Sequence, residues 1–574
     1  MYLRTIARHN KDGSTVRYLQ LAHNEWDAQR KCAVAKVVHS FGREDELDRA
    51  ALARLVRSIS RLLEPAEALA ATAPRELRFL GSKPLGGAFA LDGLWRRLGI
   101  DVTLARLLGG RRLDSAAERL LFALVCNRAL APASKLACAE WLGAEVAIPG
   151  LPELAGDPQP LYRAMDFLLQ VEPELAEAVY WQVADLLNLE VDLVLFDTTS
   201  TYFEIDEPDP PAPGGEAPGQ AESEGAAEDE APAGFRSFGH SKDHRPDLPQ
   251  IVIGLAVTRS GIPIRVWSWP GNTNDQALIR QVKDELRAWK LTRVVWVADR
   301  GFSSERNRRY LQRAGGHYIL GEKLRSASKE AQAALARQGR YHTVAGNLRV
   351  KEVVLDEGTM RDRFVICHNP EQAERDRAVR EQVLAQLEEA IAGSDSLPSL
   401  RRHDLACRLE AKPGYRRFLR TTSGGLLRID RAAVAAEERL DGKFLLRTSD
   451  PTLSAEDVAL GYKQLLEVEQ AWRDLKTTLD LRPVFHRKQE RIRAHVLLCW
   501  LALLLIRIAE TTTGETWRNL RRELQRMHLG EFQGSAGRVL QRSETTPAQR
   551  QILRSLALDD PPRFFEVQPA QAAS

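Results

Sequence analysis

The sequence has few cysteines, no leader-like segment and no apolar run long enough to cross a membrane. Its six cysteines among 574 residues are scattered and form no C-x-x-C pair. A disulfide framework or a structural zinc site is therefore not expected, and a reducing cytosol fits. The first residues lack the charged and apolar segments of a signal peptide. The longest apolar run, Val496 to Ile506, is shorter than the roughly 20 residues that span a bilayer, so we expect a buried core helix and a cytoplasmic protein without membrane contact.

Acidic residues are unevenly distributed along the chain. Nine of them lie between Asp206 and Glu230, a stretch without lysine or arginine, although the net charge of the whole chain is +3. The remainder is therefore strongly basic, which suits a polyanionic partner, and a solvated basic surface would give the same balance. Residues 207–234 are rich in Pro, Gly, Ala and Glu, and we expect them to form a disordered insertion.

The distribution of apolar residues predicts a mixed α/β protein with several regions. Strand-like alternation on both sides of Asp12-Gly13 predicts a hairpin. Strands that alternate with helices after residue 190 predict a mixed sheet. We expect a β-rich region at 1–45, a helical region at 46–190, an α/β core at 191–324 and 456–510, an inserted α+β subdomain at 325–455 and a helical region at 511–574.

Two short β-branched runs each lead into an aspartate. Residues 191–196 precede Asp197, and residues 294–298 precede Asp299. A carboxylate at the end of a buried strand lies at the edge of the sheet. Two of them on neighbouring strands are tolerated mainly when a divalent cation lies between them. The pattern therefore indicates metal-dependent phosphoryl chemistry.

A predicted helix further along the chain carries a third acid. Tyr462, Glu469 and Lys476 follow one another at intervals of seven residues. This spacing places them along one face of a helix over residues 455–480. A carboxylate between a phenol and an ammonium suits a metal-bound phosphodiester, because the ammonium can meet a phosphate. A solvated helix face with Tyr462 packed on the core would give the same spacing.

Together these residues resemble the DDE transposases of bacterial insertion sequences, in the subgroup with a Tyr-Arg-Glu-Lys signature on the last helix. The similarity covers roughly residues 192–508, and the order of the motifs makes it specific. The motifs are Asp197 to Ser200, Gly239 to Asp247, Pro270 to Asp275, Val297 to Phe302, Leu481 to His486 and Arg491 to Val496. One position departs from the signature: its arginine, expected three residues after Tyr462, is Leu465.

The resemblance implies an RNase H-like core in which Asp197, Asp299 and Glu469 hold two Mg²⁺ ions, with Mn²⁺ as a substitute and Asp197 shared by both. Two such ions can activate a nucleophile and stabilise the leaving oxygen of an in-line displacement. The implied reaction cuts the ends of an insertion sequence and joins the 3′-hydroxyls to target DNA. The implied partners are double-stranded DNA, at terminal inverted repeats and at the target, and a second copy of the chain in a homodimer on paired ends. The implied location is the cytoplasm, at the nucleoid.

Further residues are candidates for DNA contact under this resemblance. They are Tyr462, Lys476, Lys242, His244 and Arg245, of which Lys242 or Arg245 could replace the missing arginine. A pair of short helices joined by residues 127–133 is another candidate, although any helical domain contains such pairs. Two other functions stay open: an inactive relative that only binds DNA, and an RNase H-like nuclease without strand transfer.

Overall fold

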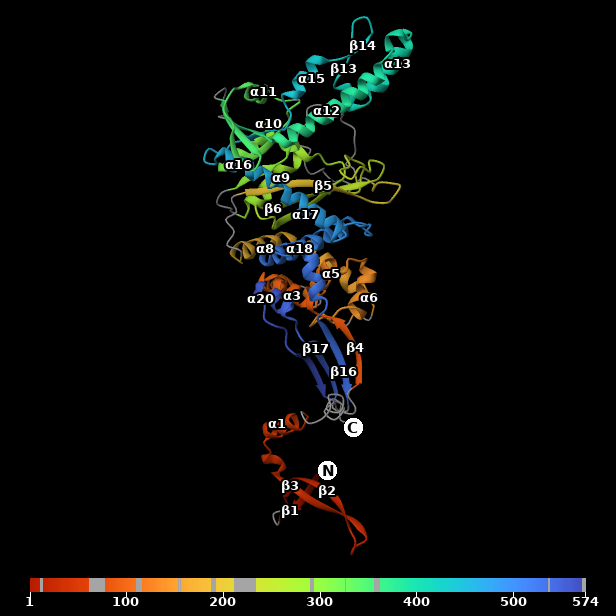
Figure 1. Cartoon of the computed structure of the whole chain (residues 1–574), viewed down its shortest axis with the longest axis vertical. Helices are drawn as coiled ribbons and strands as arrows, with labels where there is room; N and C mark the ends of the chain where they lie inside the picture. Colours follow the sequence, from red (N-terminus) through yellow and green to blue (C-terminus); the bar gives the residue numbers. More distant parts are fainter. Residues whose placement is uncertain are drawn as a thin grey trace. The chain divides into compact units, whose positions relative to one another are not determined.

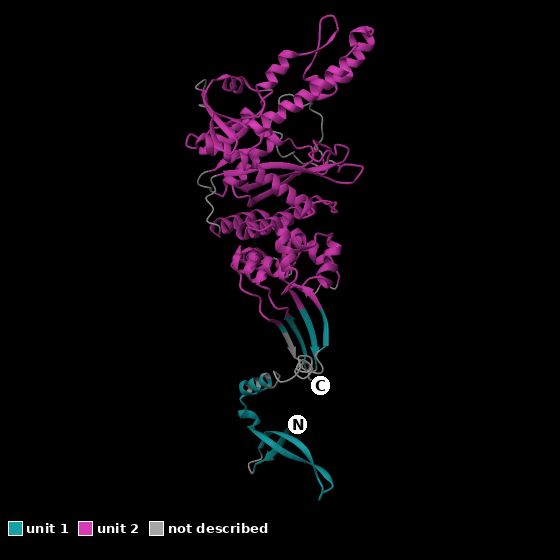
Figure 2. Cartoon of the chain, in the orientation of Figure 1, with its two compact units in different colours: residues 1–81, 530–541, 566–574 teal, residues 82–529, 542–565 magenta. Residues whose placement is uncertain are grey.

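The chain forms two compact units in a computed structural model (Figures 1 and 2). Unit 1 comprises residues 1–81, 530–541 and 566–574, and unit 2 comprises residues 82–529 and 542–565. The structure describes residues 1–10, 14–60, 78–109, 116–152, 154, 156–186, 193–210, 234–289, 294–325, 327–355, 362–534 and 537–569. Most of the expected disordered insertion at 207–234 lies outside the described residues, as does the Asp12-Gly13 turn.

Unit 1 begins with a three-stranded antiparallel sheet. Its strands, in spatial order, are β1 (Tyr2–His9), β2 (Thr15–Asp27) and β3 (Cys32–Arg43). β1 and β2 pair along their length, from Tyr2 opposite Ala22 to His9 opposite Thr15, as their alternation predicts. Among the residues of these strands only Ala22 is buried. The helix α1 (Arg49–Ser60) follows.

Helices occupy the first part of unit 2. They are α3 (Gly86–Arg97), α4 (Ile100–Leu108), α5 (Ala117–Leu130), α6 (Lys135–Ala144), α7 (Gln159–Gln170) and α8 (Glu172–Leu186). α5 is buried from Leu120 to Leu130, because α7 and the later helix α18 pack against it. It is therefore a central helix of the core rather than a surface helix.

A nine-stranded sheet forms the centre of unit 2 and confirms the expected mixed α/β class. Its order is β10-β11-β12-β15-β9-β8-β5-β6-β7, and β8 runs parallel to both β5 and β9, whereas the other neighbours are antiparallel. The strands of this sheet that come first in the sequence are β5 (Leu193–Tyr202), β6 (Gln250–Thr258), β7 (Pro263–Pro270), β8 (Val295–Ala298) and β9 (His317–Glu322). The helices among them are α9 (Asp275–Arg287) and α10 (Glu305–Gln312).

Residues 325–455, expected to form an inserted subdomain, contribute to this same sheet. Four of their strands extend it beyond β9, because β15 pairs directly with β9. These strands are β10 (His342–Ala345), β11 (Leu348–Leu355), β12 (Asp362–His368) and β15 (Lys443–Thr448), with α11 (Lys329–Ala336) before them. The local sequence does not reveal this pairing, because β9 and β15 are separated by more than a hundred residues.

The helical part of the same stretch has a hydrophobic cluster of its own, around Leu387, Phe418 and Leu427. Its elements lie together at one end of the drawing in Figure 1. They are α12 (Pro370–Ile391), α13 (Ser399–Glu410), α14 (Pro413–Arg416), α15 (Arg431–Glu438) and the two-stranded sheet of β13 (Leu419–Thr421) and β14 (Leu427–Ile429). This part therefore packs around an apolar cluster that is separate from the core beneath the nine-stranded sheet.

The helix expected over residues 455–480 is interrupted. α16 (Ala455–Lys463) and α17 (Leu465–Thr477) meet at Gln464, so the prediction of one continuous helix is wrong. Tyr462 lies on α16, whereas Glu469 and Lys476 lie on α17. The side chains of Glu469 and Lys476 still share one face, because their spacing of seven lies within one helix.

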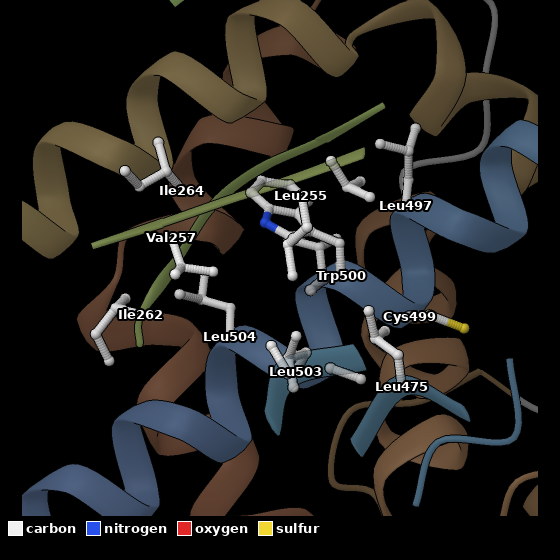
Figure 3. Packing of buried hydrophobic residues seen from close by; sticks show 14 of the residues in the cluster. Leu255, Val257, Ile262, Ile264, Leu475, Leu497, Cys499, Trp500, Leu503 and Leu504 are labelled. Carbon is white, nitrogen blue, oxygen red and sulfur yellow. The ribbon is translucent and has the colours of Figure 1, made fainter. Parts of the chain in front are cut away.

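The apolar run at the end of the core is a buried helix, as expected. α18 (Gln489–Thr513) is long and apolar enough to cross a membrane by composition, yet 89% of its most apolar stretch is buried inside the structure. Its residues Trp500 and Leu504 belong to the same hydrophobic cluster as Leu255 of β6 and Ile264 of β7, and Figure 3 shows part of this cluster. α18 thus supports the sheet that carries Asp197.

The C-terminal region, expected to be helical, is mixed. It contains α19 (Trp517–Leu524) and α20 (Pro547–Ser555), together with β16 (His528–Gly534), β17 (Gly537–Arg542) and β18 (Phe564–Pro569). These strands form a four-stranded sheet with β4 (Arg78–Pro84), in the order β18-β17-β16-β4. The helical prediction for residues 511–574 is therefore corrected. The partner strand β4 is remote in the sequence, so no local pattern indicates the sheet.

Candidate active site

Asp197 and Asp299 each come directly after the paired residues of two neighbouring parallel strands. Residues 193–196 of β5 pair with residues 295–298 of β8, and an aspartate follows each of these runs. Side chains alternate along a strand, so matched positions on neighbouring strands project to the same side of a sheet. The structure thus brings together the two carboxylates that the sequence suggested.

Asp197 differs from Asp299 in its place on the strand. β8 ends at Ala298, immediately before Asp299, whereas β5 continues through Asp197 to Tyr202. The continuation pairs with β6 as far as Tyr202 opposite Gln250. The expectation that the first strand ends at Asp197 is therefore wrong. The Thr-rich residues after it are good strand formers, and they place Asp197 inside the sheet.

The surroundings of Asp197 disfavour its negative charge. Burial, the largest cause, raises the pKa of Asp197 to about 6, and the charges of Asp299 and Asp275 act in the same direction, while Lys242 opposes them. A buried carboxylate beside a second one is stabilised by a bound cation. Asp197 and Asp299 therefore have both the oxygen donors and the electrostatic environment that a divalent cation requires.

Tyr462 contacts the carboxylate of Asp299 directly. Its hydroxyl donates a hydrogen bond of 2.9 Å to Asp299 Oδ1, and its ring stacks on Phe444 at 6.0 Å between centroids. Gly321 of β9 lies under the hydroxyl so closely that a Cβ atom there would collide with it. Burial and the charge of Asp299 raise the pKa of Tyr462, so the phenol stays protonated and is a hydrogen-bond donor.

Lys242 belongs to the loop of residues 239–249 before β6, and its side chain contacts β5, the strand that carries Asp197. Its ammonium donates to the backbone oxygen of Thr198 at 2.7 Å and to Thr198 Oγ1 at 2.6 Å, and it pairs with Asp275 Oδ2 at 3.0 Å. Its backbone N–H donates to Ser200 Oγ at 2.8 Å. Lys242, expected to contact DNA, is thus engaged within the protein.

Lys476 is engaged in the same way, through Asp243. Its ammonium donates to Thr199 Oγ1 at 2.8 Å and to Asp243 Oδ1 at 2.9 Å. The other oxygen of Asp243 forms an ion pair of 2.9 Å with Arg482. The carboxylate of Asp243 therefore joins α17 to the segment after it, and the ammonium of Lys476 joins α17 to β5. Desolvation lowers the pKa of Lys476.

Arg245 and His244 lie on the outer side of the same loop. Arg245 pairs with Asp247 at 2.8 Å, and its side chain is 40% exposed. The guanidinium carbons of Arg245 and Arg482 lie 5.2 and 5.1 Å from the centroid of the Tyr202 ring. His244 is exposed and has a positive φ of 58°. Of the cationic candidates in this loop, these two residues are the ones presented to solvent.

Sequence reasoning missed the roles of Asp243, Asp275 and Arg482, although each lies inside a motif that it quoted. The sequence signal is the joint order of the motifs, and this order does not reveal which residues of the motifs contact one another. Two motifs are also brought together through their glycines: a Cβ atom at Gly239 would collide with the carbonyl oxygen of Gly271. The close approach explains why both positions are glycine.

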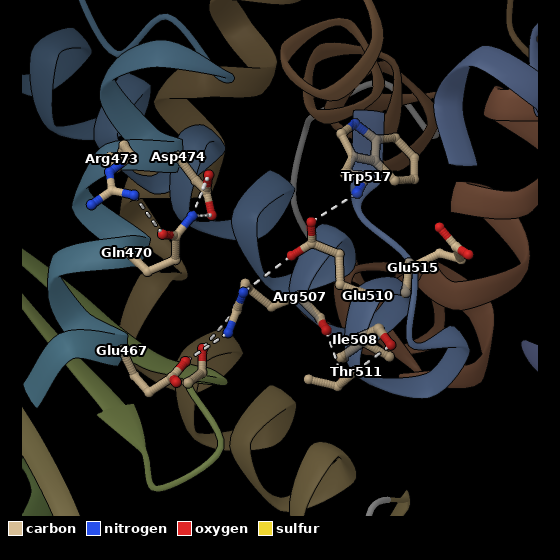
Figure 4. Close-up of polar contacts among 12 residues, drawn as sticks. Glu467, Gln470, Arg473, Asp474, Arg507, Ile508, Glu510, Thr511, Glu515 and Trp517 are labelled. Atoms are coloured by element: carbon tan, nitrogen blue, oxygen red, sulfur yellow. Dashed lines mark hydrogen bonds and ion pairs between the residues drawn. The ribbon is translucent and has the colours of Figure 1, made fainter. Parts of the chain in front are cut away.

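Glu469 is exposed on α17 and forms no hydrogen bond or ion pair with the residues that the structure describes. The helix that carries it is firmly held. Arg507 of α18 pairs with Glu467 at 2.9 Å and with Glu510 at 3.1 Å (Figure 4), and Glu510 accepts a hydrogen bond of 2.8 Å from the backbone N–H of Trp517. The backbone of α17 is therefore fixed, while the Glu469 side chain is free to turn.

The three expected metal ligands are assembled only in part. Within the described ranges, no three His, Cys, Asp or Glu side chains lie close enough together to hold a metal ion. The pair of Asp197 and Asp299 fits a divalent cation by donor type and charge. Glu469 fits by donor type and by its place on a helix that packs against β5, and its carboxylate does not reach the pair in this conformation.

Leu465, in the place of the signature arginine, is half-buried and packs on the hydrophobic core. A different cation, Arg300, lies next to Asp299. Its charge lowers the pKa of Tyr462, whereas burial and Asp299 raise it. Arg300, Asp299 and Tyr462 line a cavity of about 820 Å³ that extends to the helical insertion. Lys323 lines the same cavity.

The helix pair around residues 127–133 is poorly suited to read DNA. α5 is buried, and α5 and α6 lie at 94° to each other. The exposed residues of α6 include Leu136 and Glu140 and no lysine or arginine. Its one lysine, Lys135, is buried. This surface therefore lacks the positive charge that phosphate contacts need.

Fold and site together define an α/β protein with paired carboxylates at the centre of its sheet, and the comparisons with known families show a DDE transposase. Residues 228–505 match the family model described as transposase DDE domain, and residues 3–70 match the N-terminal domain of IS1634 family transposases. The chain belongs to the DDE transposases of bacterial insertion sequences, and its core is of the RNase H-like type.

Two further comparisons complete this finding. No curated protein sequence matches the chain. One similar solved structure is the cryo-EM structure of the piggyBac transposase synaptic complex with hairpin DNA, at 11% identity. The alignment covers 78% of this chain and 82% of that chain with a TM-score of 0.34, which is too low to establish a shared arrangement.

Proposed function

We propose that Asp197, Asp299 and Glu469 form the catalytic triad of this transposase and hold two Mg²⁺ ions, or Mn²⁺ in their place. The observation that supports it most strongly is that Asp197 and Asp299 directly follow the paired residues of the parallel strands β5 and β8. Bound between them, the ions would supply a nucleophile-activating and charge-stabilising environment for in-line displacement at phosphorus. Glu469 completes the set by turning its unengaged side chain toward the sheet.

The remaining residues of the site hold these carboxylates in place. The Tyr462 hydroxyl fixes one oxygen of Asp299 and leaves the other for a cation. Lys476 and Asp243 set the distance between α17 and β5, and hence between Glu469 and Asp197. Arg300 supplies positive charge beside Asp299 where Leu465 cannot, and Arg245 and His244 are the loop residues open to a DNA backbone.

The proposed substrates are the two ends of an insertion sequence, at terminal inverted repeats, and a target duplex. Water cuts each end and leaves a 3′-hydroxyl, which then attacks the target. Joining two ends in one event requires that both be held together, so we infer a homodimer on paired ends. The protein would act on the nucleoid in the cytoplasm.

End cleavage on the natural DNA tests this proposal. The substrate is a duplex that carries the DNA flanking the coding region on both sides, incubated with Mg²⁺. Asp197→Asn, Asp299→Asn and Glu469→Gln should each reduce cutting by more than about a hundredfold, while DNA binding in EDTA is retained. The matched control is Glu204→Gln, an exposed acid beyond the end of β5, which should cut like the wild type.

The same assay separates the alternatives. Wild-type protein that shifts the duplex and never cuts it would be a DNA-binding relative without activity. Cutting without any product joined to a target duplex would mean a nuclease without strand transfer. Normal cutting by Asp197→Asn or Glu469→Gln would exclude the triad.

A further inference from the structure

The three-stranded sheet of unit 1 has two faces of different chemistry. Directly opposed residues of an antiparallel pair lie on the same face, and successive residues alternate between faces. The pairing of Tyr2 with Ala22 fixes the faces of β1 and β2. The pairing of Ala22 with Val37 fixes those of β3 only from Cys32 to Val37, because the β2–β3 register shifts beyond that point. The face that contains Tyr2 is called face A, and the opposite one face B.

Face A combines cations and aromatic rings. It carries Arg4 and Arg8 from β1, with Tyr2 on the same strand and Tyr18 and Trp26 on β2. Tyr2 and Trp26 are 42% and 70% exposed. The Tyr2 hydroxyl donates a hydrogen bond of 2.8 Å to Asn24 Oδ1 across the two strands, which confirms that both side chains lie on this face.

The three strands place no carboxylate on face A. They contain two acids, Glu25 and Asp27, and the register places both on face B. There Glu25 is neutralised by Lys36 at 3.0 Å. Arg4 and Arg8, in contrast, make no ion pair or hydrogen bond through their side chains with any residue in the described part of the chain. The positive charge of these two arginines is therefore uncompensated within that part of the protein.

The sheet has almost no interior of its own, because only Ala22 is buried in its three strands. A sheet of this size is stable when something covers one of its faces. On face A, the arginines can bind the phosphates or guanines of a DNA partner, and the aromatic rings can contact the walls of a groove. A β-ribbon of this kind fits the major groove of double-stranded DNA.

We propose that face A is a DNA-binding surface of this transposase, with Arg4 and Arg8 as its principal contacts and Tyr2 and Trp26 beside them. The choice of DNA as the partner rests on the proposed function. A second copy of the chain fits less well, because two such faces would oppose arginine to arginine with no strand acid between them. The helix pair α5–α6 offers no comparable charge.

The test measures equilibrium DNA binding by the full-length protein in EDTA, so that no cleavage occurs. The probes are a labelled duplex with the DNA that flanks the coding region and a duplex of shuffled sequence. The variant Arg4→Ala/Arg8→Ala should bind more weakly and show a salt dependence, log Kd against log salt, that is less steep by about two phosphate contacts.

The matched control is Arg17→Ala/Lys36→Ala, which removes two cations from face B and leaves the net charge equal to that of the test variant. A second pair keeps the proposal testable if the arginine variant does not fold: Trp26→Ala on face A should weaken binding, and Leu3→Ala on face B, which is 61% exposed in the native chain, should not.

Equal losses in the face A and face B variants, or wild-type binding by Arg4→Ala/Arg8→Ala, would overturn the proposal. So would unchanged DNA binding with a loss of dimer in the same variant, because face A would then contact a second copy. The catalytic proposal fails separately, through cleavage assays in Mg²⁺, so the two outcomes cannot be confused.

Discussion

Lys476 of α17 and Asp243 of the loop before β6 form an ion pair of 2.9 Å, although 233 residues separate them in the sequence. Their side chains are only 15% and 10% exposed. The pair joins the helix that carries Glu469 to the strand that carries Asp197, because Lys476 also bonds Thr199. The geometry of the proposed site therefore depends on a contact that involves none of its three acids.

Asp243→Ala should destabilise the protein and the site together. It leaves Lys476 and Arg482 without their shared carboxylate, and breaking a buried pair of this kind costs roughly 3–5 kcal/mol. The free energy of unfolding in urea measures the effect. Asp247→Ala is the control: its ion pair with Arg245 is exposed and screened by solvent, so little loss of stability is expected. Similar losses in both variants would contradict the role given to Asp243.

Gly321→Ala should displace Tyr462 from Asp299. The added methyl group would occupy the space of the Tyr462 hydroxyl, and a shift of about 1 Å at a catalytic group can reduce turnover about a hundredfold. The cleavage rate should fall to that of Tyr462→Phe. Gly301→Ala, where the new methyl group would meet no neighbouring atom, should fold and cut normally. An active Gly321→Ala protein would show that the Tyr462 contact is dispensable.

Arg507→Ala should loosen α17 from α18. The variant loses a charged hydrogen bond to Glu467 and one to Glu510, each worth about 1.5–3 kcal/mol. Hydrogen exchange of the α17 amides should become faster, and the protein should unfold at a lower urea concentration. Arg473→Ala removes an arginine that bonds Gln470 on the exposed side of α17, and it should leave exchange unchanged. Identical exchange in both variants would argue against the proposal that Arg507 holds α17 to α18.

His486 should make the fold sensitive to acid. Burial, the largest cause, and the charges of Lys135 and Arg491 together lower the pKa of His486 from 6.5 to about 4. The folded state binds this proton less readily than the unfolded chain, so stability is complete above pH 6.5 and falls as the pH decreases toward 4. His486→Phe should flatten this dependence by up to about 1.4 kcal/mol per pH unit.

Unfolding in urea across that pH range measures the prediction. The variant His244→Phe, at an exposed position, is the control and should keep the wild-type dependence. If His486→Phe and the wild type lose stability equally between pH 6.5 and 4, the acid sensitivity comes from other groups. His495, whose pKa burial lowers still more strongly, would then be the residue to replace.

The sequence predicted the elements whose signal is local. Asp299 follows its strand as expected, and the apolar run forms α18. The sequence indicates that Asp197 lies near Asp299, but it does not show that β5 continues past Asp197, because the pairing that prolongs β5 comes from β6, which lies beyond the acidic insertion. The β strands near the C-terminus were missed for the same reason, since their sheet includes β4.

The candidate site was predictable in its residue types and not in its contacts. Lys242 and Lys476 were expected to face DNA, because a lysine in a basic motif has no visible partner in the sequence. The structure supplies Asp275 and Asp243 as their partners. A carboxylate that neutralises a cation across more than two hundred residues leaves no periodic pattern, so only the folded chain reveals it.

The most direct test of the central claim exchanges one proposed metal ligand for a softer one. Asp299→Cys should fail to cut the flanking DNA in Mg²⁺, which takes oxygen ligands, and should recover cutting in Mn²⁺, which tolerates sulfur better. Asp299→Ala should stay inactive with either ion. Equal activity of Asp299→Cys and wild type in Mg²⁺, or no recovery in Mn²⁺, would contradict the assignment of Asp299 as a metal ligand.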